Sequence, residues 1–187
     1  MLIEITSTEV KSTETFVFSA LYDALHEYMI EEGYAGDNDK FPETYYWESR
    51  TQQKGREYWI WWRFNQGTAT SFCKKHIDID IHGAGVKDIE IMYQNKKIKA
   101  NKGKLEIIIR GKLEIDPGDK WKNSRMGFLR DIFFKRMWQK QRDEHKADLI
   151  DDLERIRAFV ADFLNKPISR EMPEPFQPRM GYEREKF

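Results

Sequence analysis

Cysteine is almost absent from this sequence, and long apolar runs are missing altogether. Cys73 is the single cysteine among 187 residues, so an internal disulfide bond is excluded and a reducing compartment is favoured. No apolar run reaches the roughly 18–20 residues that a membrane-spanning helix needs. The N-terminus, MLIEITSTEV, lacks the basic and apolar regions of a signal peptide. We therefore expect a soluble, cytoplasmic protein with no membrane partner.

Signatures of catalysis are absent as well. The sequence has no glycine-rich phosphate loop and no pair of metal ligands at helical spacing. Cys73 falls in an expected strand, with Lys75 as its nearest same-side cation, and a structural cysteine there is far more common than a nucleophile. These absences favour a non-enzymatic protein with no cofactor, no catalytic residue and no metal site. An enzyme that uses an apolar cavity stays the alternative.

Net charge is zero, yet the charges are sorted along the chain. The 32 Lys and Arg residues balance 32 Asp and Glu residues. Residues 1–48 hold 11 acids and two bases, whereas residues 95–142 hold 15 bases and five acids. Such segregation predicts a basic side suited to an anionic partner. The competing interpretation is that the basic block is neutralised by the acidic N-terminal part of the same chain or of a dimer mate.

The apolar pattern begins with a strand and a helix. Residues 2–10 are expected to form a strand. A helix capped by Ser12 or Thr13 is expected to follow and to end near Gly33. From about Tyr45 onward the apolar period changes to two, which predicts an antiparallel meander with glycine-containing turns at 83–85 and 101–103. The expected strands of this meander are residues 57–64, 72–82, 86–94 and 104–116.

The last part of the chain returns to helical spacing. Apolar residues recur in steps of four and three at Leu149, Leu153, Ile156, Val160 and Phe163. The polar stretch 139–148 is either a turn near Asp143 or the solvated middle of one long helix. Usual helix lengths favour two helices over 122–165. Residues 166–187 contain four prolines and predict an extended tail.

These elements predict an α+β fold in one domain, residues 1–165. We expect a five- or six-stranded antiparallel sheet with the N-terminal helix and long C-terminal helices packed on it. The order of strand, helix, strand meander and C-terminal helix resembles the helix-grip group of START and Bet v 1-like (polyketide cyclase-like) proteins. The resemblance rests on element order alone, and no binding residue is carried over from it. It implies a cavity between the sheet and the C-terminal helix that holds an apolar small molecule.

Two strand segments carry candidate binding residues. The segment HIDIDIH places His76, Asp78, Asp80 and His82 on one face, and simple alternation favours a solvated face over a metal site. The segment YWIWWRF is apolar on both faces, so one face needs a helix, a ligand or a partner to cover it. Because Arg63 lies beside the tryptophans in the sequence, stacking of nucleic-acid bases on this strand stays an alternative interpretation. In the helix-grip alternative, the aromatic residues of this segment line the cavity: Tyr58, Trp59, Trp61, Trp62 and Phe64.

The leading functional prediction is a binding protein that docks on RNA or on a ribonucleoprotein such as the ribosome. Lysine and arginine side chains that alternate with tryptophans neutralise phosphates and offer faces for unpaired bases. The residues predicted to bind nucleic acid all lie within residues 95–142: Lys96, Lys97, Lys99, Lys102, Lys104, Lys120, Trp121, Lys122, Arg125, Arg136, Trp138 and Lys140. The aromatic residues of the tail and the opposed acidic and basic blocks also predict a homodimer, or a tail that docks on the partner, whereas the seam at 149–163 is expected to pack on the sheet.

Overall fold

The protein folds into one curved antiparallel sheet with helices on its concave side. Residues 2–35, 41–51, 55–67, 73–93, 96–115 and 139–165 are described by the structure, a computed structural model. The elements are β1 (Leu2–Ser12), β2 (Thr15–Phe16), α1 (Phe18–Glu31), β3 (Glu43–Thr51), β4 (Gly55–Gln66), β5 (Cys73–Tyr93), β6 (Lys96–Ile115) and α3 (Gln139–Asn165).

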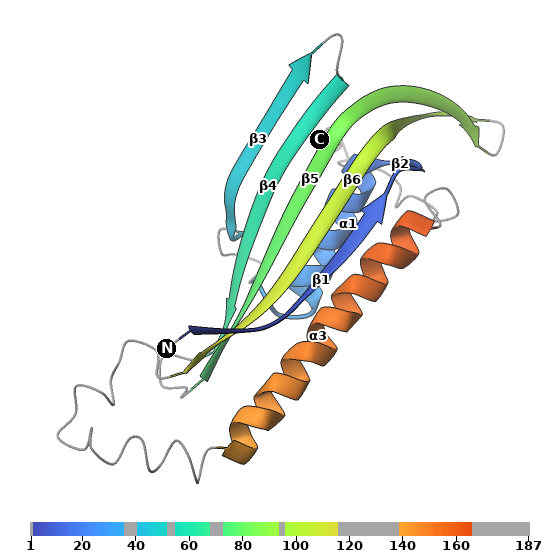
Figure 1. Ribbon diagram of the computed structural model, residues 1–187. Helices are drawn as coiled ribbons and strands as arrows, with labels where there is room; N and C mark the ends of the chain where they lie inside the picture. The colour runs from blue at the N-terminus through green and yellow to red at the C-terminus, as the bar shows by residue number, and fades with distance from the viewer. Residues whose placement is uncertain are drawn as a thin grey trace, which may run out of the picture.

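The strand order across the sheet is β1-β6-β5-β4-β3, and the short β2 also pairs with β6. All these pairings are antiparallel, and the consecutive strands β3 to β6 are neighbours (Figure 1). β1, the first strand in the sequence, lies at one edge of the sheet and pairs with the last strand, β6. The predicted α+β class and the antiparallel six-stranded sheet are therefore confirmed.

α1 and α3 pack on one side of the sheet, which we term the inner face. α1 lies over β4, where Phe18 stacks on Tyr58 with ring centroids 4.6 Å apart and Tyr22 meets Trp62 edge-on at 5.2 Å. α3 runs beside β1 (Figure 1) and contacts β1, β5 and β6. The two helices and the inner face share one core. The opposite side of the sheet, the outer face, is covered by no element in the described part of the chain.

The C-terminal helix is held by the apolar seam that its sequence predicts. Leu149, Leu153, Ile156 and Val160 are fully buried. Leu149 and Leu153 reach β6 at Gly111, where an added Cβ would lie 2.9 Å from Leu153 Cδ1. The absence of a side chain at this position lets the helix lie directly on the strand. Side chains therefore fill the space between α3 and β6 at this point.

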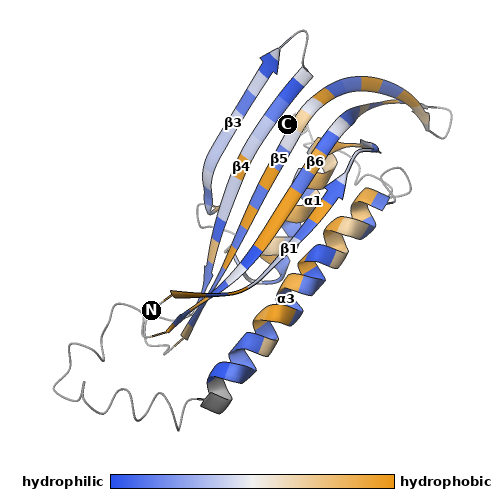
Figure 2. Ribbon diagram, in the orientation of Figure 1, coloured by the Kyte–Doolittle hydropathy of each residue, from blue (hydrophilic) through white to orange (hydrophobic). Residues whose placement is uncertain are grey.

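Alternation along the strands separates the two faces. In β5, Ile77, Ile79 and Ile81 point into the core, and Asp80 and His82 point outward. Figure 2 shows the resulting alternation of apolar and polar residues along β5. Residues that are register partners on neighbouring strands share a face, so this assignment extends across the whole sheet.

The N-terminal helix begins later than predicted. Ser12 still belongs to β1, and Thr15–Phe16 pairs with β6 at Lys102 and Asn101. Pairing with β6 keeps this segment extended, so the predicted cap at Ser12 or Thr13 is wrong. The helix starts at Phe18, whose backbone N–H donates to Asn101 Oδ1 at 3.0 Å. The cap thus comes from a residue 83 positions away.

The predicted turns at 83–85 and 101–103 are also wrong. β5 runs unbroken through Gly85, and a β-bulge falls between Ala84 and Lys87. Gly85 has φ +63°, a left-handed conformation that glycine adopts without strain, so it accommodates the extra residue. The glycines therefore bend the strands instead of ending them, and the connection between β5 and β6 lies between Tyr93 and Lys96.

The polar stretch 139–148 is helical, and α3 is continuous from Gln139 to Asn165. A turn near Asp143 is therefore wrong. Residues 122–138 of the predicted helical region and the predicted tail 166–187 lie outside the described residues.

Candidate functional site

Four aromatic side chains gather on the outer face of β3 and β4. Tyr45 and Trp47 are the register partners of Trp61 and Trp59, so all four share one face. Each residue is between 37% and 40% exposed. Tyr45 stacks on Trp61 with ring centroids 4.4 Å apart. We term these four residues the aromatic patch. Exposed aromatic surface of this kind marks a place where ligands or partners bind.

Cationic and titratable side chains border the aromatic patch. The Arg63 guanidinium lies 5.7 Å from the centroid of the Trp61 ring, within the range of a cation–π interaction. His82 stacks on Trp59 with ring centroids 3.8 Å apart. These contacts hold the two tryptophan rings from the β4 and β5 sides and leave part of each ring exposed.

The centre of the outer face is a ladder of ion pairs. Lys112 Nζ lies 2.6 Å from Asp78 Oδ2, and Arg63 Nη1 lies 2.6 Å from Asp80 Oδ1. Arg110 also pairs with Asp80. Because carboxylates and cations alternate across β4, β5 and β6, this part of the face neutralises itself and carries little unbalanced charge.

The HIDIDIH segment contributes to this ladder through all four of its polar residues. His76 Nε2 lies 2.9 Å from Glu114 Oε2, and His82 Nδ1 lies 3.8 Å from Glu106 Oε2. Each histidine thus has a carboxylate on β6. Within the described ranges, no three His, Cys, Asp or Glu side chains come together as ligands for one metal ion.

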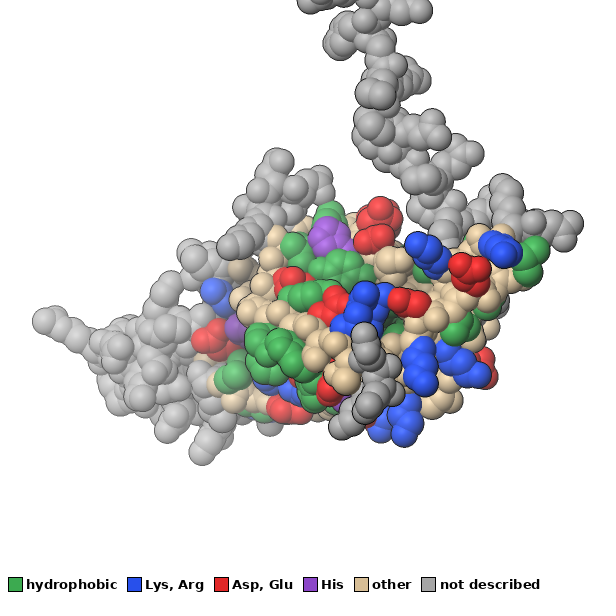
Figure 3. Space-filling view, turned by 90° about the horizontal axis from the view of Figure 1, so that it is seen from above, with side chains coloured by type: hydrophobic (Ala, Val, Ile, Leu, Met, Phe, Trp, Pro, Cys, Tyr) green, Lys and Arg blue, Asp and Glu red, His purple; other side chains and the backbone are tan. Residues whose placement is uncertain are grey.

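Three lysines form a basic group on the same face, where β5 and β6 curl. Lys87 and Lys102 are register partners across the bulge, and Lys104 follows on the same side of β6. All three are exposed, and within the described residues none of them forms an ion pair. Lys and Arg side chains also gather on one side in the view from above (Figure 3). We term Lys87, Lys102 and Lys104 the lysine group.

The structure divides the predicted basic block between the two faces. Lys102 and Lys104 belong to the lysine group, whereas alternation places Lys97 and Lys99 on the opposite face. Lys97 lies 3.9 Å from Glu90. The remaining predicted residues lie outside the described residues or have side chains outside them: Lys96, Lys120, Trp121, Lys122, Arg125, Arg136, Trp138 and Lys140.

The five aromatic residues of the cavity alternative also lie on two faces. Tyr58, Trp62 and Phe64 are buried in the core on the inner face. Trp59 and Trp61 lie on the outer face in the aromatic patch. The five therefore do not line a single cavity.

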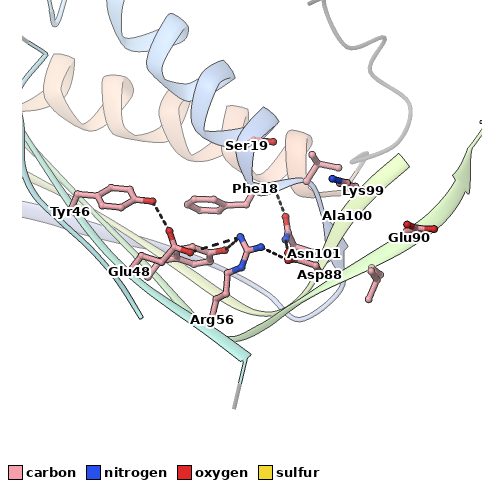
Figure 4. Close-up of a pocket in the computed structure, with 13 residues that line it drawn as sticks. Phe18, Ser19, Tyr46, Glu48, Arg56, Asp88, Glu90, Lys99, Ala100 and Asn101 are labelled. Carbon is pink, nitrogen blue, oxygen red and sulfur yellow. Dashed lines mark hydrogen bonds and ion pairs between the residues drawn. The ribbon is translucent and has the colours of Figure 1, made fainter. Parts of the chain in front are cut away.

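A pocket of about 490 Å³ does exist, on the inner face at the start of α1 (Figure 4). It lies between the first turn of the helix and the curled ends of β3 to β6. Aromatic walls come from Phe18, Tyr46 and Tyr58, and Lys99 and Ser19 also line it. Burial raises the pKa of Tyr58, so its phenol stays protonated at neutral pH.

A chain of polar contacts forms the floor of this pocket. The Arg56 guanidinium pairs with Asp88, lies 3.9 Å from Glu48 and donates to Tyr58 Oη at 3.3 Å. Asn101 donates to Asp88 Oδ1 at 3.0 Å and also caps α1. Carboxylates on both sides of Arg56 neutralise its charge, so the pocket suits a polar ligand with hydroxyl groups better than a purely apolar one.

Sequence reasoning singled out neither the pocket floor nor half of the aromatic patch. Arg56, Asp88 and Asn101 come from three strands, and no local pattern connects them. Tyr45 and Trp47 could have been predicted as candidate residues, because ETYYWES alternates like a strand whose two faces are both aromatic. Only the pairing with β4 shows which of these rings share a face.

No protein-family model matches this chain, and no curated protein or solved structure matches it either. In the described part of the chain, neither helix has the length and apolar character needed to cross a bilayer. The chemistry of the outer face and of the pocket is therefore the basis for a functional assignment.

Proposed function

We propose that the protein binds single-stranded RNA, free or within a ribonucleoprotein such as the ribosome, on the outer face of its sheet. The observation that carries the proposal is the aromatic patch, four partly exposed rings that no described element covers. Unpaired bases stack on aromatic side chains at about 1–3 kcal/mol per base, with little dependence on sequence.

The lysine group supplies the contacts to phosphate. Trp59 on β4 and Lys104 on β6 are separated by one intervening strand, β5, and by two residues along the strand direction. In a regular sheet this separation is about 12 Å. Two or three nucleotides span that distance. A strand of RNA can therefore stack on Trp59 and Trp61 while its backbone reaches Lys104 and Lys102. His82 and Glu106 lie between them, and the Glu106 carboxylate is paired with Lys11.

The test is fluorescence anisotropy with a labelled 12-nucleotide oligouridine, with the corresponding RNA duplex as competitor. We expect saturable binding to the single strand and at least tenfold weaker binding to the duplex, because its bases are not free to stack. Trp59→Ala and Trp61→Ala should each weaken binding about tenfold. Ile150→Ala on α3, which removes another exposed apolar side chain, is the matched control and should change nothing.

Equal affinity for single strand and duplex, or no loss in either tryptophan variant, would contradict stacking on the aromatic patch. Circular dichroism and thermal unfolding of each variant separate a binding defect from a folding defect.

A second candidate is the binding of a small molecule in the pocket at the start of α1. The supporting observation is its volume of about 490 Å³, within the range of ligand sites, together with its aromatic walls and polar floor. Native mass spectrometry of freshly purified protein should then show a bound molecule. Ser19→Trp, which places a large ring at the pocket wall, should abolish that adduct and leave RNA binding intact.

A further inference from the structure

β3 is the open edge of the sheet. It pairs with β4 on one side, and no described strand pairs with its other side. The opposite edge, β1, is different because α3 packs against it (Figure 1). An open edge presents a row of unpaired backbone N–H and C=O groups to any strand that approaches.

The sequence of β3 carries only some of the features that keep an edge strand from pairing. Natural edges are protected by charged side chains, above all lysine, by proline, by β-bulges or by a very short length. β3 is nine residues long, ETYYWESRT, with no lysine and no proline, and its charged residues and the irregularity between Glu43 and Tyr45 flank an uncharged stretch, Tyr45–Trp47. Its aromatic residues are exposed on both sides, with Tyr45 and Trp47 on the outer face and Tyr46 on the inner face at 49% exposure. Such a strand is suited to a partner strand.

We propose that β3 pairs antiparallel with β3 of a second copy of this chain, about a two-fold axis that passes through Tyr46. The two sheets then join edge to edge into one continuous sheet. Tyr45 and Trp47 also belong to the aromatic patch, whereas Tyr46, Glu48 and Thr44, the residues changed in the tests below, do not, so dimerisation is tested separately from RNA binding.

The side chains of β3 select this register among the symmetric alternatives. Centred on Tyr46, the pairing sets Tyr45 opposite Trp47 twice, and Glu48 opposite Thr44. Those pairs repeat the aromatic cross-strand contacts that β3 already makes with β4. Centring on Glu48 would set two carboxylates directly opposite each other, which is destabilising. Centring on Trp47 would lose both Tyr–Trp pairs.

The area available indicates a reversible dimer. Tyr45, Tyr46 and Trp47 are 40–49% exposed. At 150–250 Å² for a whole aromatic side chain, they offer about 200–350 Å² per copy. A standard interface needs about 800 Å² per partner, so the backbone and the remaining side chains of β3 must supply the rest. An interface at the small end of the range predicts dissociation at micromolar concentrations.

The first experiment is sedimentation velocity of the full chain between about 1 and 200 µM. The mass should rise from 22.5 kDa toward twice that value as concentration increases. Tyr46→Lys places two like charges at the two-fold axis and should leave only monomer at every concentration. Ile150→Lys, an equivalent change at an exposed position on α3, is the matched control and should dimerise like the wild type.

The second experiment tests the register by disulfide trapping with copper phenanthroline. Tyr46→Cys should form a covalent dimer, because the two cysteines face each other across the axis. Glu48→Cys alone should not, whereas a mixture of Glu48→Cys and Thr44→Cys chains should. The native Cys73 is buried, so the wild type is the uncrosslinked control.

A chain that is monomeric at every concentration would overturn the proposal. A strand of another protein would then be the remaining partner for β3. A dimer that survives Tyr46→Lys, or that traps equally well through Glu48→Cys alone, would also overturn it. Such a dimer forms through another surface or another register.

Discussion

Gly111 on β6 and Leu153 on α3 fit so closely that a Cβ on Gly111 would lie 2.9 Å from Leu153 Cδ1. Leu149 Cγ lies 3.2 Å from the same point. The contact fixes how close the helix comes to the sheet. It also explains why the helix-grip expectation of a cavity does not apply at this point, since the side chains of α3 fill the space.

Gly111→Ala should destabilise the protein by about 1–3 kcal/mol, because the new methyl group forces α3 away from β6. Part of this cost is offset by the smaller entropy of alanine in the unfolded chain, about 0.4–1 kcal/mol. Urea unfolding measures the change. Leu153→Ala alone should cost about 2–5 kcal/mol, and the double variant should cost less than the sum, since the shortened side chain leaves room for the methyl. Additive costs would contradict a direct contact.

The salt bridge between Lys75 and Asp152 predicts a loss of stability in acid. Lys75 Nζ lies 3.2 Å from Asp152 Oδ2 and joins β5 to α3. Burial raises the pKa of Asp152, but hydrogen bonds from Tyr34, Arg155 and Lys75 outweigh it and hold the pKa below its ordinary value. A lowered pKa contributes stability that is present above the unfolded-state value near 3.9 and is lost as pH falls through the folded-state value.

Urea unfolding midpoints between pH 6 and pH 2.5 measure this contribution. The stability difference between wild type and Asp152→Asn should be constant above about pH 5 and should shrink as the pH falls below about 4. Lys75→Met should show a weaker acid dependence than wild type, because one of the hydrogen bonds that lower the pKa is lost. A difference that stays constant down to pH 2.5 would show that the Asp152 carboxylate contributes no pH-dependent stability.

Asp78 is the most buried carboxylate of the ion-pair ladder, at 8% exposure. Asp78→Ala should destabilise the protein by about 1–3 kcal/mol, because Lys112 loses its hydrogen-bond partner. Asp78→Ala combined with Lys112→Met should recover part of that loss, since no cation is then left without a partner. Thermal unfolding of the two variants measures their stabilities. A double variant less stable than the single one would contradict the prediction.

The lysine group predicts a salt-dependent contribution to RNA affinity. Replacing Lys87, Lys102 and Lys104 with glutamate should weaken binding at about 50 mM salt by at least a hundredfold and make its salt dependence shallower. For three lost phosphate contacts, the slope of log K against log salt should fall by about 2. Anisotropy titrations at several salt concentrations measure it.

Lys97 and Lys99 provide the matched control, because they lie on the opposite face of the same strand. The double change to glutamate alters the charge in the same region by four units, so its comparison is the Lys102 and Lys104 double change, which also alters it by four. Its effect on affinity should be several-fold at most. Equal losses in the two sets of variants would show that net charge, and not the outer face, governs binding.

Several elements could be predicted because their cause is local. Alternation of Leu105, Ile107, Leu113 and Ile115 with Glu106, Lys112 and Glu114 is enough to define a strand with one buried face. Steps of four and three residues from Leu149 to Phe163 define one side of a helix. In both cases the periodicity of the apolar residues is enough to predict which side of the element is buried, whichever other element packs on that side.

Other features depend on residues distant in the chain. Ser12 is a good cap in isolation, but pairing of β1 and β2 with β6 keeps the chain extended until Phe18, where Asn101 provides the cap. Gly83 and Gly85 suggest a turn, yet Gly83 stays paired with Leu105 on β6 and Gly85 falls in a bulge of the same strand. Hydrogen bonds across the sheet outweigh local preference here, and no local pattern reveals them.

The sequence by itself determined that this protein has an α+β fold with a two-sided aromatic strand and a helix with one apolar seam, since periodicity encodes these directly. Only the tertiary structure decided which aromatic and basic residues share a surface. Trp59 meets Trp47, and Lys102 meets Lys87, through strand register, which is a relation between distant segments. Arg56, Asp88 and Asn101 likewise meet only because β5 and β6 curl over the start of α1.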